Sequence, residues 1–505
     1  MTSFGDSRWR RVAAGLALAA PLVGLSPSLA WAQSSDEGTP FDEGFAVGDW
    51  TFFPTLELRL RSEYRRNPVT TGGDVYDGEA VQLDGVDAAG AGQQVPLVLR
   101  RDPAVDNQWL IAERARLGMR VEWDVIRAQL TLQDARIWGT LPGAPSNVDA
   151  GGMGVIEPYE AYLDVRSNVE DPWLWVRAGR QRLRWGDGRL LGDDDWGARA
   201  APFDAARVHL TAGDFDLELL AAMLAFPGAI PPRLATDERR VAVDDDGQPV
   251  NAEGTGAQLY GLQASYRVFP LLAFEATAIA RVVRDPHGLR LTNGDTYTVG
   301  GRIFGEERGV DYAVEGAYQL GRVAGYGVLR DLSAFALAAR VAWQTALPWD
   351  FRFAARGAYA SGDSDPTSSD LGRFDPILPT THEHHGMMDL YSWSNLIEAG
   401  ANVSARPHEM VLVDVGYSFV GLAQPGDRWS TANLLPVGAD PNNDSRILGH
   451  EVDARIEVRP WEPLGFSGGY GAMILGDGGK AILAAAGRPA DLLHFGYLQA
   501  ELRVP

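Results

Sequence analysis

The 505-residue chain contains no cysteine, and Lys480 is the single lysine among its 45 basic residues. The lack of cysteine excludes a disulfide scaffold, cysteine-based zinc or iron–sulfur sites, and thiol catalysis. A basic excess is also missing, because the formal net charge is −22, and this argues against a general nucleic-acid-binding protein. Arginine therefore carries almost all of the positive charge.

Long apolar runs are missing beyond the N-terminus. The longest, residues 219–226, has eight residues, whereas a transmembrane helix needs about 20. At the N-terminus, three arginines precede an apolar run of 14 residues and the small-residue site Ala30-Trp31-Ala32. This order predicts a secretory signal peptide over residues 1–32, with an uncleaved anchor as the alternative. Cleavage would leave residues 33–505 as a single domain.

What recurs along the chain is the alternation of apolar and polar residues, which is typical of strands with one apolar face. Leucines at positions 56, 58 and 60 alternate with Glu57, Arg59 and Arg61. Residues 114–124 repeat the pattern, with arginines opposite Leu117. Further alternating runs follow at residues 159–165, 215–223, 274–282, 310–318, 335–343, 351–361, 411–419, 452–458 and 498–504.

The connections between these runs are alternately short and long. The short ones lie near residues 124–126, 167–172, 213–214, 268–272, 305–308, 345–350, 405–408 and 460–464. The long ones, rich in glycine, proline and aspartate, cover residues 66–108, 139–156, 184–206, 227–257, 284–295, 320–332, 362–388, 423–448 and 473–492. Eight short and nine long connections predict 18 strands.

Strict alternation of this kind places all long connections on one side, as in bacterial outer-membrane barrels with short periplasmic turns and long extracellular loops. Lipid cannot satisfy backbone polar groups, so strands cross a bilayer only as a closed sheet. The predicted fold is therefore all-β, a transmembrane antiparallel up-and-down β-barrel of about 18 strands. Tryptophans near strand ends fit interfacial girdles, although each could also pack in a core. They are Trp50, Trp109, Trp123, Trp173, Trp343, Trp349, Trp393 and Trp461.

Several different short motifs follow one another in a fixed order from about residue 113 onward. They occupy residues 133–139, 160–162, 179–181, 186–192, 203–207, 361–363, 374–376, 386–389, 393–395, 449–453 and 497–499. In this order they resemble the alginate-export family of outer-membrane porins. The resemblance implies a monomeric 18-stranded barrel in the outer membrane of a Gram-negative bacterium, with an arginine-rich conduit for an anionic polysaccharide. An exporter of this kind would need a synthesis complex in the periplasm.

The candidate conduit follows from strand parity. Charges toward lipid are costly, so residues that alternate with lipid-facing leucines should face the lumen. Guanidinium groups offer a planar fork of donors that suits carboxylates repeating along a uronate chain. The predicted conduit residues are Arg59, Arg61, Arg114, Arg116, Arg120, Arg136, Arg177, Arg180, Arg182 and Arg184. The acids expected to hold them are Asp134, Glu160, Asp164 and Asp187.

Each of these arginines has an alternative role, because porin lumens also carry ion pairs that brace the wall. Acids such as Glu57, Glu315 and Glu398 share the predicted inner face. Anion preference therefore rests on the resemblance and on the clustering of arginines, and not on composition.

Some loop residues suggest metal binding or gating. His382, His384 and His385 do not follow the His-Glu-x-x-His spacing of zinc proteases, so zinc catalysis is not predicted there, and adventitious metal binding and simple solvation are the alternatives. Acidic runs at residues 193–195, 244–246 and 440–444 could bind calcium or simply be solvated, and no complete calcium loop appears. We expect residues 362–388, a long loop, to fold over the mouth as a gate.

These observations favour an outer-membrane channel for passive passage of an anionic solute between weak sites, without a cofactor. The solute could be alginate, another uronate polymer, a small organic anion or a neutral sugar. Alternatives are a general porin and a non-conducting barrel that serves as an adhesin or structural protein. A barrel hydrolase is disfavoured, because the chain has no Gly-x-Ser-x-Gly motif and only His209 beside Thr211 suggests a catalytic pair. The expected partners are membrane lipid and the solute.

Overall fold

The computed structural model describes residues 44–69, 107–139, 156–225, 256–284, 294–325, 328–366, 368–434 and 436–504. The predicted signal peptide, the acidic run 244–246 and most of four predicted long loops lie outside the described residues. Within those described ranges, no helix is long and apolar enough to span a membrane.

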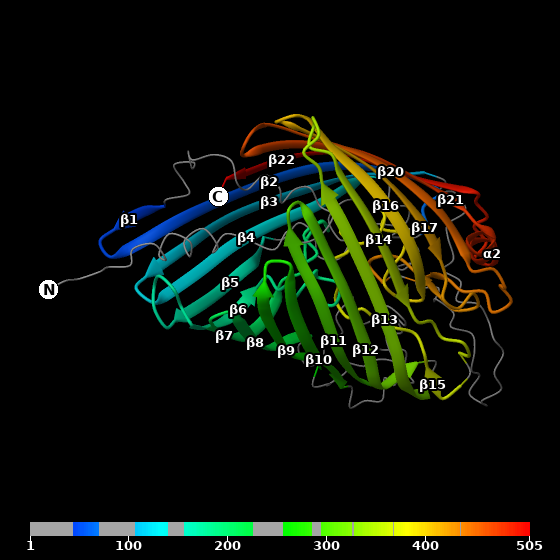
Figure 1. Cartoon of the computed structure of the whole chain (residues 1–505), viewed down its shortest axis with the longest axis horizontal. Helices are drawn as coiled ribbons and strands as arrows, with labels where there is room; N and C mark the ends of the chain where they lie inside the picture. The colour runs from blue at the N-terminus through cyan, green and yellow to red at the C-terminus, as the bar shows by residue number, and fades with distance from the viewer. Residues whose placement is uncertain are drawn as a thin grey trace, which may run out of the picture.

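Eighteen antiparallel strands form one closed barrel, as the alternation predicts (Figure 1). They are β2 (Trp50–Arg66), β3 (Asn107–Trp123), β4 (Ile126–Gly139), β5 (Glu157–Arg166), β6 (Leu174–Gln181), β7 (Phe203–Ala212), β8 (Phe215–Ala225), β9 (Gly256–Phe269), β10 (Leu272–Arg284), β11 (Gly294–Glu307), β12 (Val310–Gly325), β13 (Val328–Gln344), β14 (Arg352–Ala360), β16 (Leu396–His408), β17 (Val411–Gly421), β20 (Ile447–Trp461), β21 (Leu464–Leu475) and β22 (Leu492–Val504). Each pairs with the next barrel strand along the chain. The last, β22, pairs with β2 from Leu56↔Val504 to Arg66↔His494, which closes the circle.

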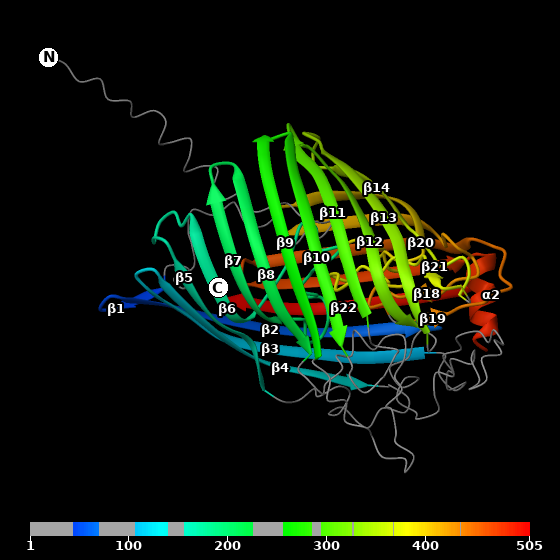
Figure 2. The same cartoon turned by 90° about the horizontal axis from the view of Figure 1, so that it is seen from below.

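A few short elements lie outside this circle. β1 (Phe45–Val47) forms a hairpin with β2, and β15 (Asp370–Leu371) runs parallel to β13. β18 (Trp429–Ser430), β19 (Pro436–Gly438) and α2 (Asp477–Ala485) lie at the end of the barrel opposite β1 (Figure 2). The described parts of the long connections lie at that end.

The two faces of the wall differ in chemistry. Leu58 and Leu60 are 43% and 53% exposed, whereas the intervening Arg59 and the following Arg61 are about 5% exposed. The same alternation continues around the barrel, with large apolar side chains exposed on the outer face. The outer surface therefore suits lipid, and the inner surface is polar and charged.

All eight predicted turns separate consecutive strands, but one predicted long loop is wrong. The glycines and charges of residues 320–332 predict a loop, yet β12 runs to Gly325 and β13 begins at Val328. The ladder continues through Gly321↔Leu332 and Arg322↔Asp331, and the last two side chains form an exposed ion pair at 2.9 Å.

The tryptophans support an interfacial girdle at the end with the short turns. Trp50 and Trp123 stack with ring centroids 5.4 Å apart, and both are exposed on neighbouring strands. Trp393 was predicted to join this girdle and does not. It is 1% exposed, and its indole N–H donates to the carbonyl of Tyr359 at 3.1 Å, inside the barrel.

Candidate functional site

Two long connections enter the barrel and contact each other. We call them the inner loops: residues 182–202 between β6 and β7, and residues 361–395 between β14 and β16. Leu191 and Leu378 form a parallel β-bridge, in which the amide of Gly192 donates to the carbonyl of Leu378 at 2.8 Å. A Cβ on Gly192 would lie 2.5 Å from the amide nitrogen of Thr380, so only glycine allows this approach. The predicted gate, residues 362–388, thus lies against the first inner loop.

Arginines of β2 and β3 bind the first inner loop. Arg59 donates to the carbonyls of Asp195 and Gly197 at 2.9 and 2.7 Å, and Arg61 donates to the carbonyl of Trp196 at 2.9 Å. Arg114 donates to the same Asp195 carbonyl at 2.9 Å. These buried guanidinium groups therefore satisfy backbone carbonyls that would otherwise lack partners.

Two carboxylates complete this contact. Arg116 donates to the carboxylate of Asp195 at 2.8 Å, and Glu57 accepts from both Arg114 and Arg116. Burial would raise the pKa of the Asp195 carboxyl, but Arg114 and Arg116 outweigh it and hold that pKa well below its ordinary value. The acidic run 193–195 is consequently paired with protein groups.

The opposite wall holds the same loop through Asp187. Its carboxylate pairs with Arg302 of β11 and, at 3.3 Å, with Arg340 of β13. Burial would raise the pKa of Asp187, and the arginines outweigh this effect and lower it. The first inner loop thus spans the lumen between β2–β3 and β11–β13.

The second inner loop contributes its histidines to this assembly. His384 lies 2.6 Å from the carbonyl of Asp187, and Nδ1 of His385 lies 3.0 Å from the carboxylate of Glu398. Burial and the nearby Arg189 and Arg184 lower the pKa of His384 well below its ordinary value, so this ring is neutral at physiological pH. The described part of the chain holds no group of three or more His, Asp or Glu residues that could bind a metal ion.

Four more predicted conduit arginines lie on the lumen side. Arg177 forms a two-point ion pair with Asp164 at 2.5 and 2.8 Å and stacks over Tyr162 at 3.9 Å. Arg182 pairs with Asp193, and its side chain stays 49% exposed. The remaining two are Arg120, which pairs with Glu122 at 3.2 Å, and Arg184, which pairs with Glu383 at 2.8 Å. Glu160, predicted to hold these arginines, lies close to Arg177 and Arg182.

Three predicted residues face the outside of the barrel. Arg136 pairs with Asp134, and their register partners Glu113 and Ala115 alternate with the buried Arg114, so both lie on the outer face. Arg136 was assigned to the lumen because it is close in sequence to Gln133, but residues three apart on a strand point to opposite faces.

Arg180 follows the same rule. It pairs in register with Ala161 and Asp204, next to the exposed Leu163 and Val176, and its guanidinium binds Asp204 at 2.7 Å. It lies at the end of β6, where it lines a cavity of about 510 Å³ together with residues of both faces.

Several residues of the inner assembly were not predicted from the sequence, including Arg302 and Arg340. They alternate with the outward-facing Ile303 and Val341, so the parity used for β2 and β3 would have found them. The contacts of Met387 and Met388, whose amides donate to Asp453 and Glu451, carry no comparable sequence signal.

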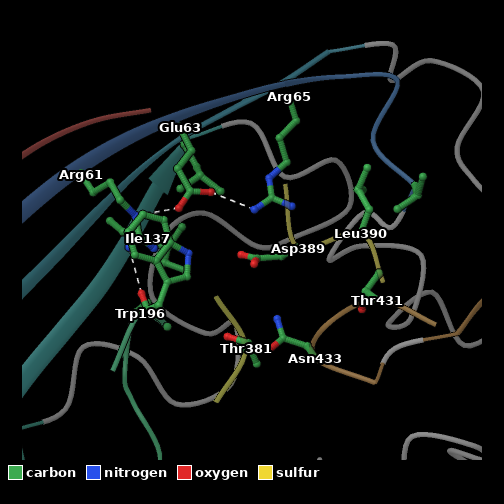
Figure 3. A pocket seen from close by; sticks show the side chains of 15 residues that line it. Arg61, Glu63, Arg65, Ile137, Trp196, Thr381, Asp389, Leu390, Thr431 and Asn433 are labelled. Carbon is green, nitrogen blue, oxygen red and sulfur yellow. Dashed lines mark hydrogen bonds and ion pairs between the residues drawn. The ribbon is translucent and has the colours of Figure 1, made fainter. Parts of the chain in front are cut away.

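A cavity of about 220 Å³ lies where the inner loops, together with Thr431 and Asn433 from the connection between β17 and β20, meet the ends of β2, β3 and β4 (Figure 3). Glu63 binds Arg61 at 2.7 Å and Arg65 at 3.0 Å on one side of this cavity. Trp196 lies between the guanidinium of Arg61, 4.0 Å from its ring, and the ring of His382, which is stacked 3.6 Å away. Asp389 faces the same cavity from the second inner loop.

Comparison with known proteins identifies the sequence family. A family model described as alginate export matches residues 94–223 and 289–482, which together are more than half of the chain. No curated protein matches the chain in sequence.

Solved structures share the fold. The crystal structure of Pseudomonas aeruginosa OccK9 (OpdG) is 12% identical with a TM-score of 0.53, covering 92% of this chain and 100% of that one. P. aeruginosa OpdK, solved with vanillate, is 9% identical with a TM-score of 0.51, covering 89% and 98%. Acinetobacter baumannii OccAB2 is 11% identical with a TM-score of 0.50, covering 90% and 98%. At these identities the similarity concerns the fold alone.

Proposed function

Because the chain belongs to the alginate-export family, we propose that it is an outer-membrane channel that passes an anionic polysaccharide, most simply a uronate polymer, by passive diffusion. The proposal includes export from a periplasmic synthesis complex, cleavage of residues 1–32 and a monomeric barrel of residues 33–505. Family membership and the barrel fold support an outer-membrane channel, as opposed to an enzyme. The anionic nature of the solute goes beyond what the family and the fold support, and it is the part of the proposal that needs further argument.

The observation that carries this proposal is the pair of inner loops bound between opposite walls. They bring charged side chains and backbone across the lumen, as expected of a channel that selects its solute and not of an open general pore. Much of the binding is done by arginines, so Arg59, Arg114 and Arg116 are engaged with the first inner loop. The solute contacts must then come mainly from arginines that keep donors toward the lumen.

Arg182 and Arg177 are the best such candidates. Arg182 has a half-exposed side chain, and Arg177 uses Nε and Nη2 for Asp164 while it lies over Tyr162. A guanidinium stacked on an aromatic ring holds its fork in a fixed orientation for a passing carboxylate. Several weak contacts of this kind allow passage without tight capture.

We expect the double substitution Arg177→Ser and Arg182→Ser to reduce the chloride-over-potassium permeability ratio by about three- to tenfold. Both changes remove positive charge from the lumen and leave Asp164 and Asp193 without those partners, so the local potential becomes negative. The measurement is the reversal potential of the purified channel in a planar bilayer with a salt gradient.

The matched control is the double substitution Arg136→Ser and Arg322→Ser. It also removes two arginines and two ion pairs, with Asp134 and Asp331, but both side chains lie on the outer face. It should leave the permeability ratio unchanged. Equal ratios in both double variants, or cation preference in the unaltered channel, would contradict the proposed anion path.

A further inference from the structure

We propose that the cavity between β2–β4 and the inner loops is a binding subsite for one hexuronate residue of the solute. This inference rests on the proposed function and adds a defined position and chemistry to it. The cavity lies toward the end of the barrel with the long connections, since Arg65 is next to the last residue of β2. A chain leaving the barrel would therefore meet it late in its passage.

The polar groups of the cavity are complementary to a ligand that carries both an anionic group and a hydroxyl donor. Arg65 uses Nη2 for Glu63 at 3.0 Å, whereas its Nε is buried without a hydrogen-bond partner. Glu63 is occupied by Arg61 and Arg65, so Arg65 remains the group suited to a carboxylate. Asp389 presents a carboxylate that is 11% exposed and lies 3.0 Å from Nδ1 of His382.

The arrangement of these two groups selects against simpler ligands. In Figure 3, Arg65 and Asp389 point into the same space from different elements. An inorganic anion would suit Arg65 but meet the negative charge of Asp389, and a neutral sugar would leave the Arg65 donor unmatched. A sugar acid can give its carboxylate to Arg65 and a hydroxyl to Asp389.

The size and the remaining lining agree with a single sugar ring. The volume of about 220 Å³ is below the roughly 300–1,000 Å³ of sites for drug-sized ligands. Ile137 provides an apolar contact for the C–H face of a ring, and Thr381, Thr431 and Asn433 add hydroxyl and amide groups at the other side (Figure 3). Leu110 also lines the cavity. The two arginines and two acids balance in charge, which suits weak binding.

The test is the block of single-channel current by trimannuronate added on the side of the long connections. Arg65→Gln should shorten each blockade about tenfold, the loss expected when one charge-assisted hydrogen bond is removed. Asp389→Asn, on the facing loop, should also shorten it. The matched control is Arg66→Gln, because Arg66 is the next residue on β2 and is exposed on the outer face, so its blockades should equal those of the unaltered channel.

Maltotriose serves as the neutral probe, and its blockades should not respond to Arg65→Gln. Trimannuronate blockades that are equal in Arg65→Gln and Arg66→Gln would overturn the subsite and leave the anion channel intact. If Arg65→Gln shortened the blockades by both sugars equally, the subsite would also be overturned, because the cavity would then recognise the shape of the sugar ring and not its carboxylate. A channel that excludes anions altogether would overturn the proposed function together with the subsite.

Discussion

Replacing Asp187 by alanine is expected to release the first inner loop from β11 and β13 and to raise the mean single-channel conductance several-fold. Asp187 is the carboxylate that joins this loop to Arg302 and Arg340 on the opposite wall. Removing one partner of a buried ion pair costs roughly 3–5 kcal/mol, and the lower end applies because Glu275 and Asp311 still pair with the two arginines. Such a cost is enough to populate states in which the part of the loop around Asp187 detaches from β11 and β13, while residues 195–197 stay bound to β2 and β3.

Planar-bilayer recordings of single channels measure this effect. Asp331→Ala is the matched control, since it removes an ion pair with Arg322 whose side chains are more than 60% exposed and whose worth is at most about 1 kcal/mol. Its conductance should equal that of the unaltered channel. If Asp187→Ala also leaves the conductance unchanged, the inner loops do not limit the path.

Replacing Leu262 by arginine should strongly impair folding into a bilayer. Leu262 lies at the middle of β9 and is 40% exposed on the outer face, where lipid would surround it. An arginine at the midplane of a barrel's lipid face costs about 2–4 kcal/mol. The measurement is the free energy of unfolding in phosphatidylcholine vesicles from reversible denaturant titration.

Ser265→Arg places the same side chain three residues further, on the inner face opposite Asp216, whose side chain is 43% exposed. It should change the free energy of unfolding by less than about 1 kcal/mol, because water and a carboxylate are available there. Similar losses for both substitutions would show that the two faces do not differ in environment.

Much of the fold could be predicted from the sequence because one physical constraint acts along the whole chain. Lipid outside and water inside impose a period of two, so the leucines of β2 and the arginines of β3 reveal the strands and their faces. The prediction failed at residues 320–332, where glycines and charges continue the ladder between β12 and β13. The exposed pair of Arg322 and Asp331 lies on the outer face, so the apolar residues that would predict a strand are missing at these positions.

The site could be predicted only where side chains alternate between the two faces of a strand. This parity identifies Arg59, Arg61, Arg114 and Arg116 as inward-facing, and it would have excluded Arg136 had it been applied to β4. Parity does not indicate which partner an inner arginine binds, because residues 182–202 reach it from more than 60 positions away in sequence. Irregular loops satisfy backbone groups through contacts that depend on the assembled barrel.

The barrel closes through the pairing of its first strand, β2, with its last strand, β22. An engineered disulfide tests this closure most directly. The chain has no cysteine, so Leu58→Cys with Leu502→Cys creates the single pair, at register partners whose Cα atoms should be about 4.5–5.5 Å apart. The control, Leu58→Cys with Leu498→Cys, is four residues out of register, about 13 Å along the strand. The closed barrel predicts rapid oxidation within one molecule for the first pair and none for the second, read as a mobility shift on electrophoresis. Equal crosslinking of both pairs, or links only between molecules, would contradict it.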